Sequence, residues 1–221
     1  MMKNRYISKV FIYFLFLLLI LIHIVYAQPT HMIFDHLTTN DGLSSNRIQC
    51  IYRDSKDYLW ISTGRGLNRY DSYQIKTYNF DRKKAGTISS DRTTFILEDH
   101  NKNLWIGTDE GLNLYNPQTE TFKVFKNDST DIHSINSNFI TNIFEDKKGN
   151  LWITTANDCL HKWIPGKQNF VRYPIKDRDG IIRSHPTMKS IAEDSKGNLW
   201  VVSYELRSCQ TNCFCYNQSL F

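Results

Sequence analysis

Leu59-Trp60-Ile61-Ser62-Thr63 is a short apolar stretch whose first two residues return three more times along the chain. The later copies of this Leu-Trp pair are Leu104-Trp105, Leu151-Trp152 and Leu199-Trp200. The tryptophans are therefore 45, 47 and 48 residues apart. The residue six positions before each tryptophan is an aspartate: Asp54, Asp99, Asp146 and Asp194. A regular period of this length is typical of proteins built from repeated structural units.

Each unit divides into four short apolar pieces, separated by Gly, Asn, Asp or Pro. In the second unit the pieces cover residues 93–97, 104–108, 112–115 and 121–125. Pieces this short, rich in β-branched and aromatic residues and bounded by turn residues, predict strands. The longer runs that a helical repeat requires do not occur within the units. Four antiparallel strands per unit form one blade of a β-propeller.

The predicted fold is all-β, with about fourteen strands in blades of four. The blades cover residues 46–80, 91–126, 138–174 and 186–203, and because the last is partial, about three and a half blades form an open arc. Residues 28–45 form a lead-in that contains Met32–Leu37, a candidate ring-closing strand. Residues 204–221 no longer match the pattern and contain Cys209, Cys213 and Cys215, so we expect an aberrant tail from a truncated or frame-shifted end.

Residues 1–27 have the composition of an export signal. Three basic residues, Lys3, Arg5 and Lys9, surround the start of an apolar run that reaches Ile22, and Val25-Tyr26-Ala27 fits a signal-peptidase site. An uncleaved anchor is the alternative reading, but His23 interrupts the run before it reaches the roughly 20 residues of a comfortable membrane span. We therefore predict a helical signal peptide and an exported chain.

The net charge of +5 comes largely from this signal. Removing its three basic residues leaves 24 basic against 22 acidic residues, a net charge of +2. A nucleic-acid-binding domain would keep a strong basic excess, so the sequence disfavours nucleic acid as a partner.

Two stretches of the first unit resemble a known family. Phe34 to Asn46, and Leu59-Trp60-Ile61-Ser62-Thr63 through Asn68-Arg69-Tyr70-Asp71, are similar to the opening and the blade signature of the two-component regulator propeller family. The resemblance implies the periplasmic sensor region of a hybrid histidine kinase anchored in the inner membrane. It also implies further blades and downstream kinase modules as partners, and a homodimer as a possible assembly.

The residues show no catalytic constellation, metal site or cofactor motif. The cysteines near the end lack a second ligand pair at zinc-finger spacing, and the repeated aspartates lack the alternating oxygen donors of a calcium loop. We interpret the aspartates as turn-stabilising residues and Trp60, Trp105, Trp152 and Trp200 as core residues between blades. The chain itself is therefore not expected to be an enzyme.

With no catalytic or metal site predicted, the function left to consider is the binding of a ligand at the surface. In a propeller, the loops before the innermost strand and those between the second and third strands gather at one face, where binding residues accumulate. The candidate ligand-binding residues in these loops are Arg47, Arg65, Arg92, Asp109, Glu110, Phe139, Asn157 and Asp158.

Two classes of function stay open. The first is the ligand-sensing input region of a membrane-spanning sensor kinase, with an oligosaccharide as the ligand. The second is an exported propeller enzyme of the lyase or glycosidase type, or a stand-alone carbohydrate-binding or adhesion module. Because the end blades of an open arc expose apolar faces and unpaired strand edges, we expect residues 28–221 alone to associate and to lack signalling.

Overall fold

A computed structural model of the chain describes residues 12–18, 34–156, 159–174, 187–205 and 210–216. The chain divides into two units, Met1–His36 and Leu37–Phe221. The first unit contains a helix over residues 12–18, inside the predicted signal segment, whose apolar side chains are exposed. None of the helices among the described residues is long and apolar enough to cross a membrane. The predicted cleavage site at Val25–Ala27 lies outside the described residues.

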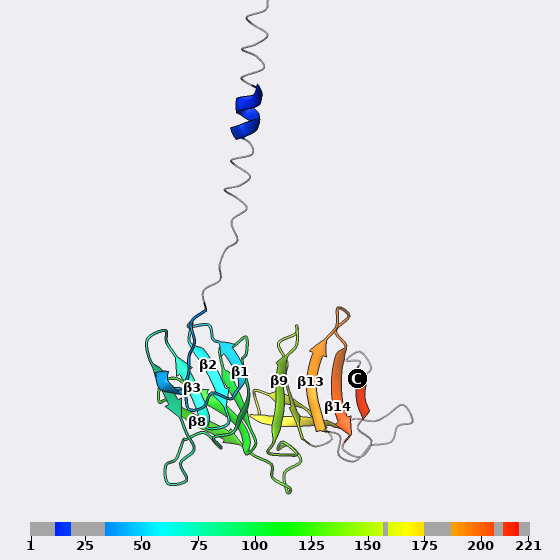
Figure 1. The fold of residues 1–221 in the computed structure, drawn as a ribbon. Helices are drawn as coiled ribbons and strands as arrows, with labels where there is room; N and C mark the ends of the chain where they lie inside the picture. Colours follow the sequence, from blue (N-terminus) through cyan, green and yellow to red (C-terminus); the bar gives the residue numbers. More distant parts are fainter. Residues whose placement is uncertain (1–11, 19–33, 157–158, 175–186, 206–209, 217–221) are drawn as a thin grey trace, which may run out of the picture. The chain divides into compact units, whose positions relative to one another are not determined.

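The second unit contains four antiparallel sheets that follow one another along the chain (Figure 1). The first blade has strands β1 (Ile48–Arg53), β2 (Leu59–Thr63), β3 (Gly66–Tyr70) and β4 (Ile75–Tyr78). The second has β5 (Thr93–Glu98), β6 (Leu104–Thr108), β7 (Gly111–Asn116) and β8 (Thr121–Phe125). The third has β9 (Ile140–Glu145), β10 (Leu151–Thr155), β11 (Cys159–Ile164) and β12 (Asn169–Pro174). The predicted blade architecture is confirmed, and the described blades do not close into a ring.

The fourth blade extends further than the sequence predicted. It has β13 (Thr187–Glu193), β14 (Leu199–Glu205) and β15 (Gln210–Tyr216), and β15 pairs antiparallel with β14 along its whole length. Part of the stretch expected to be an aberrant tail, Gln210–Tyr216, is therefore a strand, which was not predicted. The open edge of β14 offers unpaired backbone groups, and a segment compatible with extended structure satisfies them whether or not it matches the repeat. The described strands number fifteen.

The lead-in segment contains a short 3-10 helix, η1 (Thr39–Asp41), capped by Thr38. Residues 34–37, the described part of the predicted ring-closing strand, form no strand. A strand needs a partner for its backbone groups, and no described strand pairs with this segment.

The first strand of every blade carries a bulge at the same place. The register shifts between Ile48 and Cys50, between Thr93 and Phe95, between Ile140 and Asn142, and between Met188 and Ser190. One extra residue reverses the alternation of side chains, so residues three apart face the same side. Ile140 and Ile143 are both buried as a result.

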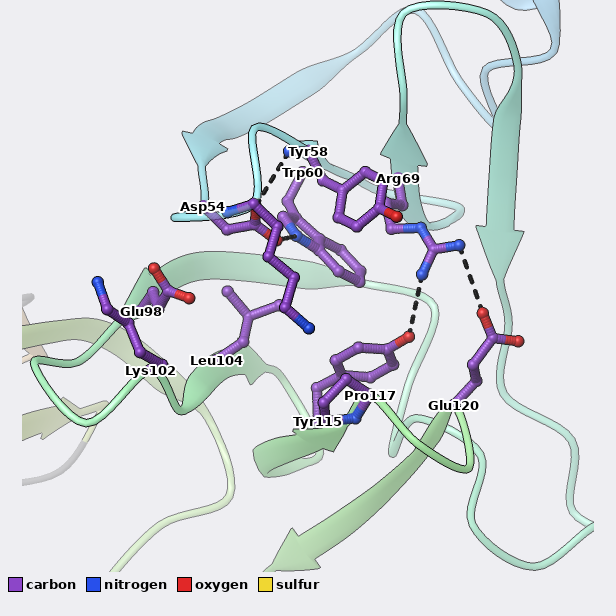
Figure 2. Close-up of a pocket in the computed structure, with 11 residues that line it drawn as sticks. Asp54, Tyr58, Trp60, Arg69, Glu98, Lys102, Leu104, Tyr115, Pro117 and Glu120 are labelled. Atoms are coloured by element: carbon purple, nitrogen blue, oxygen red, sulfur yellow. Dashed lines mark hydrogen bonds and ion pairs between the residues drawn. The ribbon is translucent and has the colours of Figure 1, made fainter.

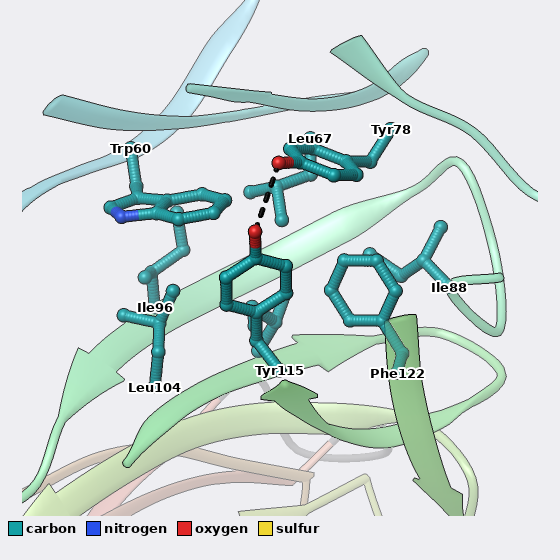
Figure 3. Close-up of a cluster of buried hydrophobic side chains, with 9 residues drawn as sticks. Trp60, Leu67, Tyr78, Ile88, Ile96, Leu104, Tyr115 and Phe122 are labelled. Atoms are coloured by element: carbon teal, nitrogen blue, oxygen red, sulfur yellow. Dashed lines mark hydrogen bonds between the residues drawn. The ribbon is translucent and has the colours of Figure 1, made fainter. Parts of the chain in front are cut away.

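The core lies between neighbouring blades. Figure 3 shows the first of three clusters, in which the Trp60 ring packs against Tyr78 of its own blade and Tyr115 of the next, with centroids 5.8 and 5.0 Å apart. Trp60, Trp105 and Trp152 are at most 2% exposed, as a position between two blades requires. Trp200 is 40% exposed and is therefore not the core residue that the sequence predicted. Its ring stays partly open because no described blade follows the fourth one.

The first strands of the second, third and fourth blades each end in a glutamate. This glutamate accepts hydrogen bonds from the preceding blade and so joins the two. Glu98 accepts hydrogen bonds from the backbone N–H (2.8 Å) and the hydroxyl (2.9 Å) of Ser55, in the β1–β2 turn of the preceding blade. Glu145 accepts the backbone N–H of His100 at 3.0 Å, and Glu193 accepts that of Lys147 at 2.8 Å. We call these three contacts the glutamate clamps. The first blade has Arg53 at the corresponding position.

A buried polar group holds the opposite end of each blade to the segment that precedes it. Asn68 accepts the backbone N–H of Ser44 at 3.0 Å, and Asn113 accepts that of Ser89 at 2.9 Å. In the third blade His161 replaces the asparagine, and its Nε2 accepts the backbone N–H of Asn136 at 3.0 Å. Accepting at Nε2 requires a neutral ring whose proton sits on Nδ1, where it faces the Ile153 carbonyl at 3.3 Å.

Candidate functional site

The repeated aspartates and tryptophans have a structural role that the structure defines atom by atom. In all four blades one carboxylate oxygen accepts the indole N–H of the tryptophan six residues later, at 2.7, 2.9, 2.8 and 3.1 Å. The other oxygen accepts backbone N–H groups two and four residues later, as from Lys56 and Tyr58 at 2.9 and 3.0 Å. Each aspartate therefore fixes the turn and the tryptophan together. Among the described residues, no cluster of His, Cys, Asp or Glu is arranged to hold a metal ion.

The predicted ligand residues differ in whether other side chains engage them. Arg92 pairs with Asp109 at 3.1 Å, and Lys126 approaches Glu110 at 3.8 Å, so the two acids are engaged by neighbouring basic residues. One oxygen of Asp109 is buried and has no hydrogen-bond partner among the described residues. Arg47, Arg65 and Phe139 have exposed side chains. In the described part of the chain, no hydrogen bond or ion pair joins these side chains to Asp109 or Glu110. Asn157 and Asp158 lie outside the described residues.

The structure places a cavity of about 250 Å³ at the other end of the strands, between the first two blades. We call it the Arg69 pocket (Figure 2). The first blade contributes the β1–β2 turn and β3, and the second contributes the end of β5, the β5–β6 turn and the β7–β8 turn. Its lining residues are Asp54, Lys56, Tyr58, Trp60, Arg69, Glu98, Lys102, Leu104, Tyr115, Pro117 and Glu120.

Arg69 is the central polar group of the pocket. Its guanidinium lies over the Tyr58 ring, 4.7 Å from the centroid, an arrangement that a cation and an aromatic face both favour. One guanidinium nitrogen donates to the Tyr115 hydroxyl at 3.2 Å, and the other lies 3.3 Å from a Glu120 oxygen. The Arg69 side chain is 20% exposed, so it is held in place and still reaches the cavity.

Glu120 completes the polar wall. Lys76 donates a hydrogen bond to its second oxygen. This bond is the main cause that lowers the pKa of Glu120 below its usual value, although partial burial opposes the shift. The carboxylate therefore stays ionised beside Arg69 at neutral pH.

Beneath this wall the Tyr78 and Tyr115 hydroxyls lie 3.0 Å apart. Burial, followed by the hydrogen bond to Tyr115, raises the pKa of Tyr78 well above its ordinary value. Tyr115 lines the pocket, and Tyr78 supports it from behind as an uncharged phenol.

Tyr58 is a position at which the first blade departs from the repeat, and Arg69 stands at a position that differs from unit to unit. The residue two before the tryptophan is asparagine in the other three units, and the Asn103, Asn150 and Asn198 side chains each donate to their own repeated aspartate at 3.0, 2.8 and 2.9 Å. Opposite the tryptophan, β3 has Arg69, whereas β7 and β11 have Leu114 and Lys162. Neither residue is part of the pattern that the units share, so the repeat does not predict them. A comparison of the units for their differences would have found them.

Comparisons with known proteins agree with the fold. The profile of the family described as "Two component regulator propeller" matches residues 42–65, 87–110 and 134–157. A solved extracellular domain, assigned to hybrid two component system BT3049 of B. thetaiotaomicron, superposes with a TM-score of 0.68 at 23% identity over 81% of this chain and 26% of that chain. A second, assigned to one component system BT4673 of the same organism, gives 0.62 at 22% identity over 82% of this chain and 27% of its own.

A curated relative, Histidine kinase P4 of Formosa agariphila, is 33% identical over 63 residues, which are 28% of this chain and 5% of that protein. The chain thus spans about a quarter of the length of the two solved domains and a small part of the kinase. At these identities the solved structures establish the propeller fold. Together with the blades described above, the three matched stretches show that this chain carries repeats of the two component regulator propeller family.

Proposed function

We propose that this chain is part of the exported sensing region of a two-component signalling protein, in which the blades bind an oligosaccharide and membrane and kinase modules follow. The observation that carries the proposal is the run of three family repeats on blades that the structure confirms. Two solved structures of similar fold are described as extracellular domains of a hybrid and a one component system, and one curated relative is a histidine kinase. The basic and apolar composition of residues 1–27 supports export to the periplasm.

The genomic sequence downstream of the Phe221 codon tests this proposal. We expect a membrane-spanning helix followed by a histidine-kinase core, in the same frame or in a shifted one. A stop codon with neither module downstream would contradict the sensor assignment and favour an independent exported binding protein or enzyme.

Export is tested separately with alkaline phosphatase fused after Ser203, because this reporter folds only in an oxidising compartment. We expect activity from the natural fusion and none from a matched fusion in which Leu15→Arg and Leu18→Arg interrupt the apolar run. Equal activity of the two fusions would contradict the export signal.

A further inference from the structure

We propose that the Arg69 pocket binds one neutral pyranose ring of a glycan. The inference rests on the proposed function, because it names the site and the ligand class through which the sensing region would recognise an oligosaccharide. It does not use the loop residues that the sequence predicted, which lie at the other end of the strands.

The first argument is that other units build the same turn and strand without a tyrosine or an arginine at the positions of Tyr58 and Arg69. Three units build the same turn with asparagine, whose amide donates to the repeated aspartate and satisfies an oxygen of it. The first unit gives up that hydrogen bond and places a tyrosine there, and it places an arginine where the second unit has Leu114. Tyr58 replaces the asparagine although this removes a hydrogen bond that the other units keep. Such a replacement indicates that the residue is required for something other than the stability of the turn.

The second argument concerns size. The cavity of about 250 Å³ falls below the roughly 300 to 1,000 Å³ of pockets that enclose drug-sized ligands. It therefore admits one ring with its substituents and not an extended chain. Because the cavity opens between two turns, the neighbouring sugars of a glycan would continue into solvent.

The third argument concerns charge. The lining residues include three basic side chains (Lys56, Arg69 and Lys102) and three acidic ones (Asp54, Glu98 and Glu120), so their formal charges cancel. An anionic ligand would find Arg69 already neutralised by Glu120, at 3.3 Å. A cationic ligand would meet Arg69 and two lysines. A neutral ligand avoids both penalties.

The fourth argument concerns the type of neutral ligand. Tyr58 provides the aromatic surface that is partly exposed, and it suits the C–H face of a sugar ring, while the buried Trp60 and Tyr115 rings support the wall behind it. Arg69 has five N–H donors, of which contacts with Tyr115 and Glu120 engage only part, and ionised Glu120 is an acceptor. Adjacent ring hydroxyls both donate and accept, and therefore match a paired guanidinium and carboxylate at the rim of an aromatic pocket.

The test uses the full chain and four simple probes: the methyl glycosides of glucose, galactose, mannose and xylose. Binding is measured by titration calorimetry and by saturation-transfer NMR. We expect at least one glycoside to bind saturably. Tyr58→Asn and Arg69→Leu, which install the residues of other blades, should each weaken that binding about tenfold or more, the loss of one good polar or stacking contact. Lys83→Ala, at an exposed position that does not line the pocket, should leave it unchanged.

The variants also have a fold control. Both variants lose contacts of Tyr58 or Arg69 and should unfold at a somewhat lower temperature than the wild type. Because Asn and Leu occupy these positions in other blades, both should still be folded at the titration temperature, and a lower binding constant then reports on the pocket. Three results would overturn the proposal: no saturable binding of any glycoside by the wild-type chain, equal binding by the two pocket variants, or tighter binding of glucuronate than of methyl glucoside. Each of these leaves the genomic test of the sensor assignment unaffected, so the two proposals fail separately.

Discussion

The repeated aspartate is the residue on which each blade depends most. Asp99 is 6% exposed and accepts the Trp105 indole N–H together with the backbone N–H groups of Asn101 and Asn103. Asp99→Ala leaves a buried indole N–H and two turn amides without acceptors. We expect a loss of about 2 to 4 kcal/mol in the free energy of unfolding, measured by urea denaturation.

Asp71 provides the matched control for this prediction. Its carboxylate accepts the backbone N–H groups of Tyr73 and Gln74 in an exposed turn but contacts no tryptophan. Asp71→Ala should therefore cost clearly less than Asp99→Ala. Equal losses would show that turn capping, and not the tryptophan, accounts for the aspartate.

His161 gives the third blade a dependence on pH. Burial lowers the pKa of this histidine from 6.5 to about 4, with a smaller contribution from the positive charge of Arg172. The unfolded chain therefore binds a proton between pH 6.5 and 4 that the folded chain excludes. The stability that His161 contributes is complete above pH 6.5 and is lost as the pH falls toward 4, by about 3 kcal/mol in total.

The variant H161N isolates this effect. Asparagine holds the corresponding position in the first two blades, so the fold should persist. The difference in unfolding free energy between the wild type and H161N should change between pH 7 and pH 4, because all other titrating groups are shared. A constant difference across that range would contradict the prediction.

At the scale of the strand and the turn, the sequence predicted most of the fold. Tryptophan spacing and turn residues located twelve strands of three complete blades and the first two of the fourth. Apolar residues three apart, as at Ile140 and Ile143, resemble a helical turn, and the recurrent bulge explains why a strand produces them. β15 could not be predicted, since its pairing depends on the free edge of β14 and not on the repeat.

The candidate site was predicted less well for a related reason. Position in a loop indicates that a residue is accessible, but not which partner holds it, so the pairing of Arg92 with Asp109 emerged only from the structure. The Arg69 pocket forms between residues of two blades that are far apart in the sequence, as with Arg69 and Tyr115, which are 46 positions apart. Such a juxtaposition depends on how blades pack, which the pattern of one unit does not contain.

The glutamate clamp between the second and third blades should be detectable through the pKa of His100. The hydrogen bond between Glu145 and the His100 ring raises the pKa of His100 above its ordinary value. Glu145→Gln removes the negative charge and should return that pKa toward 6.5, as followed by NMR titration of the ring protons. Glu193→Gln changes the corresponding residue of the next clamp and should leave His100 unaffected. An unchanged pKa in Glu145→Gln would contradict the described contact.

At the scale of the whole molecule, the blades differ in how they are covered. Trp60, Trp105, Trp152 and Trp163 are between 1 and 8% exposed, whereas Trp200 is 40% exposed. Acrylamide should therefore quench one class of tryptophan fluorescence, and Trp200→Phe should remove that class. Trp152→Phe, a buried counterpart, should leave the quenchable fraction intact. If a longer form of the protein covers the fourth blade, Trp200 should become resistant in that form.

The glutamate clamps have a consequence for how such a chain can change over generations. The acceptor in each clamp is a side chain of the later blade, but the donor common to all three is a backbone N–H, from Ser55, His100 or Lys147. A backbone donor is present whatever residue stands there, so a duplicated or deleted unit still fits its new neighbour without a compensating substitution. Only the first blade, with Arg53, lacks the acceptor. Gene rearrangements that gain or lose an internal unit should therefore be tolerated, while transplanting the first unit into the interior should break the joint it creates.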